Sequence, residues 1–460
     1  MDSIPGPRPR RRAGRRSVGF ALIMLMTTAC VSYEAQPMNP LEILQDLNTR
    51  TIPLDGEGAE NSLTARRAAA WAVRHHPALT AARARLGIAR AELVEAGVLD
   101  PIETSFDAAD VIASKLVEST ATTVDFVSGL GLSWGLPRPG EIDAKEGRAR
   151  ARIEEVKASI LAAEWALARD VHLAFVDLRA ARDRWALNRR LLEAVKRTSE
   201  VFSEARRIGA ATAIQDNLAA IEYATLLQRD VLLRGLLAEA KQALNVRVGL
   251  RPDADVPFDL DAMEPLPKVG GAARDMDLVR DALTGRPDFQ ALLYRYLEAE
   301  AGVRLQIALQ WPKISIGSGL GISWPILNSF NRPAINVALA RREQLAGEVV
   351  AMVHRIRGEV FAALARFRAA HQAEQSLRDT LLPRIEETTR LTEESFDARE
   401  ITFLEILSAQ RQVLSARRAE LEARVTLNRA AIQLDTVTGR LLVEPPTPDA
   451  KERSDEEKKR

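Results

Sequence analysis

The sequence predicts a mainly α-helical protein with a small β part, built from two tandem helix–β-hairpin–long helix–helix repeats. Three observations lead to this prediction. The stretch between Pro139 and Pro252 contains no proline, and apolar residues recur there every three or four positions, as in an amphipathic helix. Stretches near residues 130 and 320 alternate apolar with small or polar residues, which is typical of β-strands. Similar motifs recur about 190 residues apart, which indicates an internal repeat.

The first long helix is expected from Arg138 to Ile208, followed by a turn at Gly209 and a return helix from Thr212 to about Leu250. A rise of about 1.5 Å per residue makes the long helix on the order of 100 Å. An element of this length belongs to a coiled coil, a helical barrel or a spacer rather than to a compact domain.

A second copy follows the first in the same order. Trp134 and Trp324 lie 190 residues apart, and so do Thr212 and Thr402, which follow the two expected turns. The elements expected in the second copy are a helix from Asp277 to Leu309, a long helix that starts at 331–333 and bends at Pro383, and a return helix from Thr402 to about Gly439.

The first 29 residues resemble a bacterial signal peptide, because several arginines precede the short apolar segment 18–26. Cys30, the only cysteine, follows Ala29 directly and is expected to carry a lipid. Ordinary cleavage after Ala29 is the alternative, and it leaves a free thiol in an oxidising compartment. The segments expected along the chain are a signal peptide (1–29), a lipid-anchored extended leader (30–62), a first repeat (63–250), a linker (251–275), a second repeat (276–443) and a disordered charged tail (444–460).

The two strand regions differ in length. Residues 102–136 have room for two strands of roughly 10 residues, the length that crosses a membrane in a β-barrel. Residues 313–326 have room only for a short hairpin, which we expect to turn near residues 317–319. Two hairpins supply at most four strands, too few to close a barrel, and open strand edges are not tolerated in lipid. Three chains supply enough strands, so the pattern favours a trimer that forms an outer-membrane β-barrel continued by a periplasmic α-helical barrel.

Four motifs give the chain a resemblance to a known family. They are His76-Pro77-Ala-Leu79, its partner Arg286-Pro287-Asp288-Phe289, the stretch Trp324-Pro325-Ile326-Leu327-Asn328, and residues 396–411, which contain Ile401-Thr402-Phe403-Leu404-Glu405. Together they resemble the outer membrane efflux protein family, the TolC-like exit ducts, over residues 63–442. Asn331-Arg332-Pro333 and Cys30 look most like the heavy-metal efflux and lipoprotein branches of that family.

The resemblance implies a passive exit duct of a tripartite efflux system, which passes small molecules or metal ions to the exterior. It implies a homotrimer that contacts lipid in the outer membrane of a Gram-negative bacterium and extends into the periplasm. Its implied partners are a periplasmic adaptor and an inner-membrane pump. Two alternatives stay open: the exit duct of a type I secretion system, and a non-conducting periplasmic coiled-coil lipoprotein, which the short second hairpin favours.

In the family, the two helix turns constrict the duct and meet the adaptor. The residues expected there are Gly209, Thr212, Gln215, Asp216, Arg399, Thr402 and Glu405. Asp216 and Glu405 of three chains would form a ring of carboxylates that favours cations. Helix capping by the threonines and by acids of the first helical turn is the alternative. Trp134 and Trp324 are expected at the membrane interface, with packing at a strand end as the alternative.

No catalytic residue, cofactor site or metal site is expected. The five histidines (His75, His76, His172, His354 and His371) show no metal-ligand spacing. The glycines at 317, 319 and 321 are not followed by the Lys-Ser/Thr pair of a phosphate loop. A net charge of +1 gives no strong field that would favour nucleic acid.

Overall fold

A computed structural model describes residues 33–52, 62–100, 103–106, 130–262, 265–267, 275–317, 320–323, 325, 329–397 and 402–441. The chain divides into two units, residues 1–50 and 51–460. Three of the candidate site residues, Cys30, Trp324 and Arg399, lie outside the described residues.

The first unit contains helix α2 (Pro40–Thr49), in a stretch that the sequence analysis predicted to be extended. The side-chain oxygen of Asn39 accepts a hydrogen bond of 3.1 Å from the backbone N–H of Leu41, and Pro40 occupies the first turn. Proline is tolerated there because its missing N–H would have no partner within the helix. The prediction is wrong at this point because it took Pro40 as a helix breaker rather than as a helix start.

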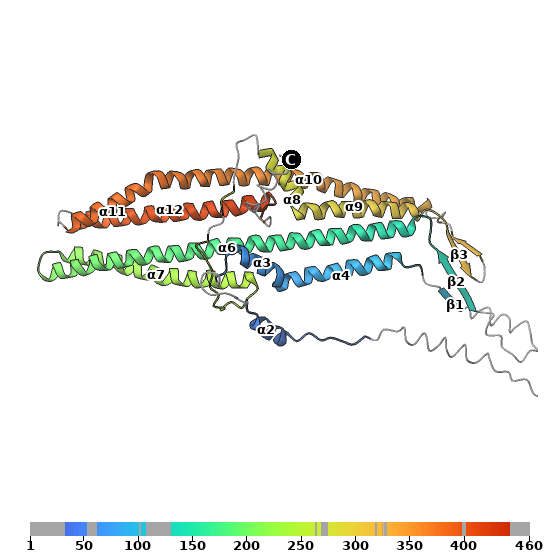
Figure 1. The fold of residues 1–460 in the computed structure, drawn as a ribbon, viewed down its shortest axis with the longest axis horizontal. Helices are drawn as coiled ribbons and strands as arrows, with labels where there is room; N and C mark the ends of the chain where they lie inside the picture. The colour runs from blue at the N-terminus through green and yellow to red at the C-terminus, as the bar shows by residue number, and fades with distance from the viewer. Residues whose placement is uncertain are drawn as a thin grey trace, which may run out of the picture. The chain divides into compact units, whose positions relative to one another are not determined.

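The second unit is mainly helical, and its long helices run alongside one another (Figure 1). The same order of elements occurs first over residues 65–248 and then over residues 275–437: two shorter helices, two strands, a long helix and a return helix. The first set is α3 (Ala65–His75), α4 (Pro77–Gly97), β1 (Glu103–Phe106), β2 (Leu130–Leu136), α6 (Glu141–Arg207) and α7 (Ala213–Val248). The second set is α8 (Asp275–Gly285), α9 (Pro287–Ala308), β3 (Lys313–Gly317), β4 (Leu320–Ser323), η3 (Ser329–Asn331), α10 (Arg332–Ser376), η4 (Leu377–Leu381), α11 (Leu382–Asp397) and α12 (Phe403–Val437).

The long and return helices begin and end within three residues of their predicted bounds, but two details differ. The helix predicted over 277–309 is broken at Arg286, because Pro287 cannot continue the hydrogen bonding of α8 and begins α9 instead. The kink predicted at Pro383 is a π-helical turn, η4, in which the N–H of Leu382 donates to the C=O of Leu377. Pro383 has no N–H for an α-helical bond, and the wider turn just before it accommodates that loss.

Two main clusters of buried apolar side chains hold the helices of the second unit together. One joins α3, α6 and α7 and includes Val171, Phe175 and Leu244; the other joins α8, α9, α10 and α12. The predicted linker closes the first cluster: Phe258 meets Phe175 edge-on, with ring centroids 5.4 Å apart. Residues 251–262 therefore pack as part of the body rather than as a free connection. None of the described helices has both the length and the apolar composition that crossing a membrane requires.

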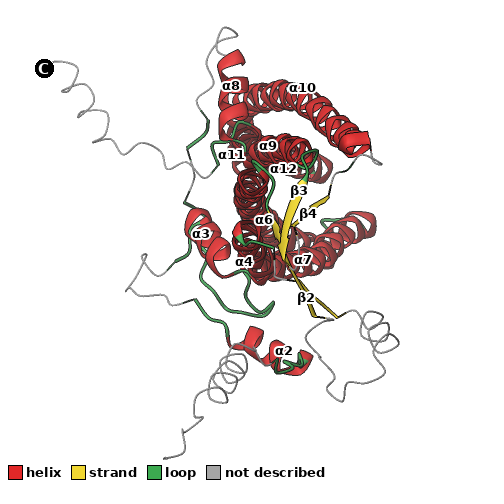
Figure 2. Ribbon diagram, turned by 90° about the vertical axis from the view of Figure 1, so that its right-hand side faces the viewer, coloured by secondary structure: helices red, strands yellow, loops and turns green. Residues whose placement is uncertain are grey.

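The strands form one antiparallel sheet in the order β1-β2-β3-β4, which joins the two halves of the unit through the β2–β3 pair. Figure 2 looks toward the ends of the helices and shows these strands gathered in front of them. Strand β3 ends at Gly317 and β4 begins at Leu320, which confirms the short hairpin predicted for the second copy.

Candidate functional site

The first helical hairpin turns at Gly209, which has a φ of +79°, between α6 and α7. Thr212 caps α7: its hydroxyl accepts from the backbone N–H of Gln215 at 3.3 Å. The side-chain oxygen of Gln215 accepts in return from the backbone N–H of Thr212 at 2.8 Å. This reciprocal arrangement is a capping box, and it satisfies two N–H groups that a helix start leaves without partners.

Asp216 lies one residue further along α7 and pairs with an arginine on the other side of the same hairpin turn. Its carboxylate binds the guanidinium of Arg206, near the end of α6, at 2.8 Å. The pair bridges the two sides of the turn, so Asp216 helps to close the hairpin. The predicted ring role for this carboxylate stays a prediction.

The second hairpin has the same capping chemistry with a charged partner. Thr402 caps α12, and Glu405 takes the place of Gln215: its carboxylate accepts from the backbone N–H of Thr402 at 2.9 Å and from the Thr402 hydroxyl at 2.6 Å. These two hydrogen bonds, from the hydroxyl and from the N–H, lower the pKa of Glu405. The capping alternative is therefore confirmed for Thr212, Thr402 and Glu405, and Gln215, which was not predicted to cap, completes the first box.

Acid is expected to loosen the second tip through Glu405. Its folded pKa lies below the ordinary value of 4.5, so the box contributes fully above pH 4.5 and is lost as the pH falls through the lowered value. Hydrogen exchange of the Thr402 and Glu405 amides, corrected for intrinsic rates, should accelerate over that range. In the variant Glu405→Gln, which copies the neutral box of the first tip, these amides should show no such acceleration. Equal acceleration in both proteins would contradict the conclusion that protonation of Glu405 loosens this capping box.

Ion pairs tie the two hairpins to each other along α6 and α12. Arg184 binds both carboxylate oxygens of Glu422 at 2.7 Å, and Asp177 binds Arg429 at 2.5 Å. On each helix the acid precedes the base by seven residues, so two antiparallel helices bring each acid opposite a base. Closer to the tips, Arg411 of α12 binds Glu222 of α7 at 2.6 Å. These contacts were not predicted from the sequence, although the seven-residue spacing of opposite charges on both helices could have indicated them.

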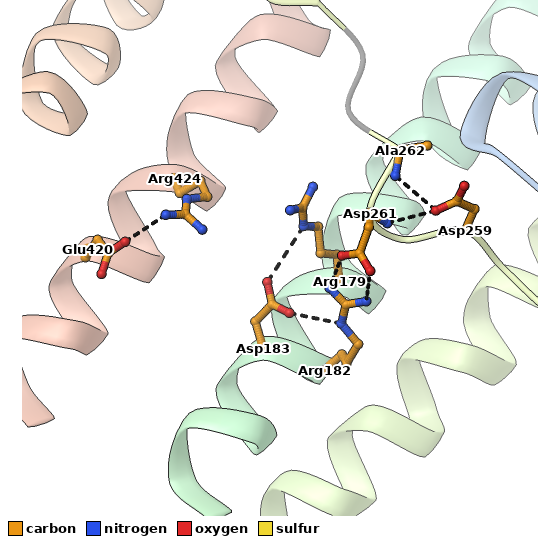
Figure 3. A network of polar contacts seen from close by, with 8 residues as sticks. All are labelled: Arg179, Arg182, Asp183, Asp259, Asp261, Ala262, Glu420 and Arg424. Carbon is orange, nitrogen blue, oxygen red and sulfur yellow. Dashed lines mark hydrogen bonds and ion pairs between the residues drawn. The ribbon is translucent and has the colours of Figure 1, made fainter. Parts of the chain in front are cut away.

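A second polar network fastens residues 251–262 to α6 (Figure 3). Arg182 binds Asp261 at 2.7 Å and Asp183 at 3.0 Å, and the Asp259 carboxylate accepts from the backbone N–H groups that follow it. The hydrogen bond from Arg182 holds the pKa of Asp261 below its usual value. Beside the network lies a small pocket of mixed character whose lining includes His172, Phe175 and Leu260. Within the part of the chain that the structure describes, no group of three or more His, Cys, Asp or Glu is placed to hold a metal.

The sheet has two chemically different faces, because cross-strand partners share a face. Ile314 faces Ile322, and Ile316 faces both Leu320 and Trp134. These four aliphatic side chains are between 41% and 74% exposed. The opposite face carries small and polar residues: Ser133, Gly135, Lys313, Ser315, Gly321 and Ser323. Among the described strands, β1 and β4 each pair along one edge only.

Trp134 lies partly buried in the middle of β2, on the apolar face. Its indole N–H donates to the backbone carbonyl of Asp100 at 3.2 Å. The indole is therefore held by the chain itself, which agrees with the packing alternative and leaves its place at a membrane interface as a prediction.

Comparison with known proteins identifies this fold. Residues 278–440 match the family model described as outer membrane efflux protein. This part of the chain carries an outer membrane efflux protein domain. The toluene efflux pump outer membrane protein TtgF of Pseudomonas putida is 23% identical to this chain over 336 residues, which span 67% of this chain and 68% of that protein.

Solved structures of outer membrane channels share the fold. The outer-membrane channel OprN superposes with a TM-score of 0.66 at 20% identity, covering 82% of this chain and 89% of that one. The open state of the Neisseria gonorrhoeae MtrE outer membrane channel superposes with a TM-score of 0.65 at 19% identity, covering 83% of this chain and 91% of that one. The resemblance predicted from the proline and hairpin-turn motifs is confirmed by the family model and by the named relative.

Proposed function

We propose that this efflux-family protein is the outer membrane exit channel of a tripartite efflux system, passive and without enzymatic activity. It acts as a homotrimer in the outer membrane of a Gram-negative bacterium, with its helices in the periplasm. A periplasmic adaptor meets the hairpin tips, including the stretch around Arg399, and an inner-membrane pump supplies the energy. The cargo is small molecules or metal ions.

The observation that carries this proposal is the amphipathic sheet beyond the ends of the long helices. Ile314, Ile316, Leu320 and Ile322 expose aliphatic side chains on one face, which suits lipid, and the other face is small and polar, which suits a water-filled lumen. The free edges of β1 and β4 need partners in a bilayer, because unpaired N–H and C=O groups cost several kcal/mol each in hydrocarbon. Strands of further copies supply those partners.

Helix α7 offers a second surface for a further copy. Its exposed apolar residues include Ile214, Ile221, Leu232 and Leu236, which are 53% to 71% exposed. Their spacing of seven, eleven and four places them along one side of the helix, over about 33 Å. Apolar stripes of this length are unusual on a monomer and mark a contact between proteins.

Assembly and conductance test the proposal together. Detergent-purified mature protein should cross-link as trimers and pass stable currents in planar bilayers. The variant Leu232→Glu places a charge on the α7 stripe and should reduce trimers severalfold. Ala238→Glu places the same charge at an exposed position on another side of α7 and should assemble normally. Monomers that leave the membrane without detergent and pass no current would reject the channel.

A non-conducting periplasmic spacer is the second candidate, and the lengths of β3 and β4 favour it. Strand β3 has five residues and β4 has four, so the described hairpin extends about 17 Å at 3.3 Å per residue. The hydrocarbon core of a bilayer is about 30 Å thick. A membrane-bound protein that forms trimers but never conducts would favour this candidate over the channel.

We also propose that Cys30 anchors the chain to the outer membrane through a lipid. Metabolic labelling with palmitate should mark the wild-type protein, and the label should be absent from Cys30→Ala. The variant should still be exported if the preceding residues act as a signal peptide. Label that persists in Cys30→Ala would show that the anchor has been assigned to the wrong residue.

A further inference from the structure

Lys313 and Asp100 form an ion pair where the helices meet the sheet. Lys313 is the first residue of β3, and Asp100 follows α4, so 213 residues separate the partners. The ammonium nitrogen lies 2.6 Å from a carboxylate oxygen, and the two side chains are 35% and 38% exposed. The pair is therefore well formed and still reached by water.

The structure makes room for this pair at Gly135. In the sheet, Gly135 of β2 lies opposite Ser315, two residues after Lys313, so the Lys313 side chain passes over the glycine to reach Asp100. A Cβ at position 135 would overlap Cε and Nζ of Lys313. The Asp100 backbone is held in turn by the indole of Trp134. A side chain at position 135 would therefore displace the end of the flexible Lys313 side chain from this path.

The pair belongs to the polar face of the sheet. Lys313 lies opposite Ser323, and Ser315, Gly321 and Gly135 continue the same face. In the proposed channel this face lines the lumen, and its base, next to the ends of α4 and α9, is the neck between barrel and helical tunnel. Each chain of the trimer places one ammonium and one carboxylate there.

We infer that the Lys313–Asp100 pairs form a charge-compensated ring at the neck of the channel and set its preference between anions and cations. The inference rests on the proposed channel function. Rings of charged side chains select ions by sign, and a ring of matched pairs has no net charge. Removing one partner from every chain leaves a ring of uncompensated charges of the other sign, in a narrow passage where fields are focused.

The other charged groups around Asp100 do not replace either partner. Arg138 and Lys145 are both engaged with Glu141, at 3.4 Å and 2.8 Å. Glu92 and Glu95 line a hollow beside Asp100 together with Lys145. These groups are present in every variant, so a difference in selectivity between variants reports on Asp100 and Lys313.

Reversal potentials under a KCl gradient, measured on single channels in planar bilayers, test the inference. Asp100→Asn should raise the chloride-to-potassium permeability ratio severalfold, and Lys313→Gln should lower it severalfold. The double variant Asp100→Asn, Lys313→Gln should have a permeability ratio close to that of the wild type. Gly135→Ala keeps both charges and displaces only the end of the Lys313 side chain. It should therefore change the permeability ratio less than the removal of either charge.

The chain offers a matched control. Lys241 and Asp255 form a pair of the same residue types at the same distance, 2.6 Å, far along the chain from the strands. Asp255→Asn should therefore conduct with the wild-type permeability ratio. Unchanged ratios in conducting Asp100→Asn and Lys313→Gln channels would overturn the inference and leave the channel intact. A wild-type protein that inserts and passes no current would overturn the channel proposal, and the inference with it.

Discussion

Replacing Arg286 by alanine is expected to lower the free energy of unfolding by about 2–3 kcal/mol. Arg286 lies at the break between α8 and α9 and is only 8% exposed. Its guanidinium binds Asp288 at 2.8 Å and Glu359 of α10 at 2.5 Å. Without the cation, two carboxylates face each other at a helix junction. The expected loss is at the lower end for a buried charge, because both carboxylates are partly exposed to water.

The loss should shrink on acidification. Burial by itself raises the pKa of Asp288, but the hydrogen bonds and charge of Arg286 outweigh burial and hold that pKa below 3.8. The stabilisation is thus complete above pH 3.8 and is lost as the pH falls through the lowered value. Denaturant unfolding followed by circular dichroism at neutral pH and at acidic pH measures both effects.

Arg280 provides the control, on α8 just before the break. It pairs with Asp277 at 3.3 Å, and both side chains are largely exposed. Arg280→Ala should cost less than about 1 kcal/mol, as exposed pairs do. Arg286→Lys keeps the charge but loses the planar guanidinium group that binds two carboxylates, so its loss of unfolding free energy should lie between those of the two alanine variants. Equal losses for Arg280→Ala and Arg286→Ala would show that the junction does not depend on this cation.

The parts of the fold that were predictable from the sequence are those specified by neighbouring residues. The long helices follow from apolar spacing, and their starts follow from Thr212 and Thr402, whose capping boxes involve residues only three positions away. The same local chemistry was misjudged at Pro40 and Arg286, because a proline both ends one helix and begins another.

Contacts between distant parts of the chain were not predictable in the same way. Lys313 and Asp100, or Arg184 and Glu422, meet only after the sheet and the antiparallel helices have formed. A sequence rich in balanced charges contains many possible pairs, and three-dimensional placement selects among them. For the tips, the capping role was predictable from spacing, while a role in the duct depends on copies of the chain that a single protomer does not contain.

Replacing Gly439 by alanine is expected to lower the free energy of unfolding by about 2–4 kcal/mol, the sum of two separate costs. Gly439 ends α12 with a φ of +79°, and the following N–H, from Arg440, donates to the C=O of Asp435 at 2.9 Å. An L-residue in this left-handed conformation costs about 1 kcal/mol. A Cβ would also lie 2.9 Å from the carbonyl carbon of Gly285 and 3.0 Å from its Cα, and backbone atoms cannot rotate away.

Gly209 separates the two costs, because it has the same φ of +79° and the same kind of following hydrogen bond, from Ala210 to the C=O of Ala205 at 2.7 Å. A Cβ at Gly209 meets no atom within 4 Å, so Gly209→Ala should lose only about 1 kcal/mol, the conformational cost alone. The difference between the two variants therefore measures how firmly the end of α12 is pressed against the end of α8. If denaturant unfolding gives the same loss for both variants, the two helix ends separate easily, and the close approach of Gly439 to Gly285 contributes nothing to stability.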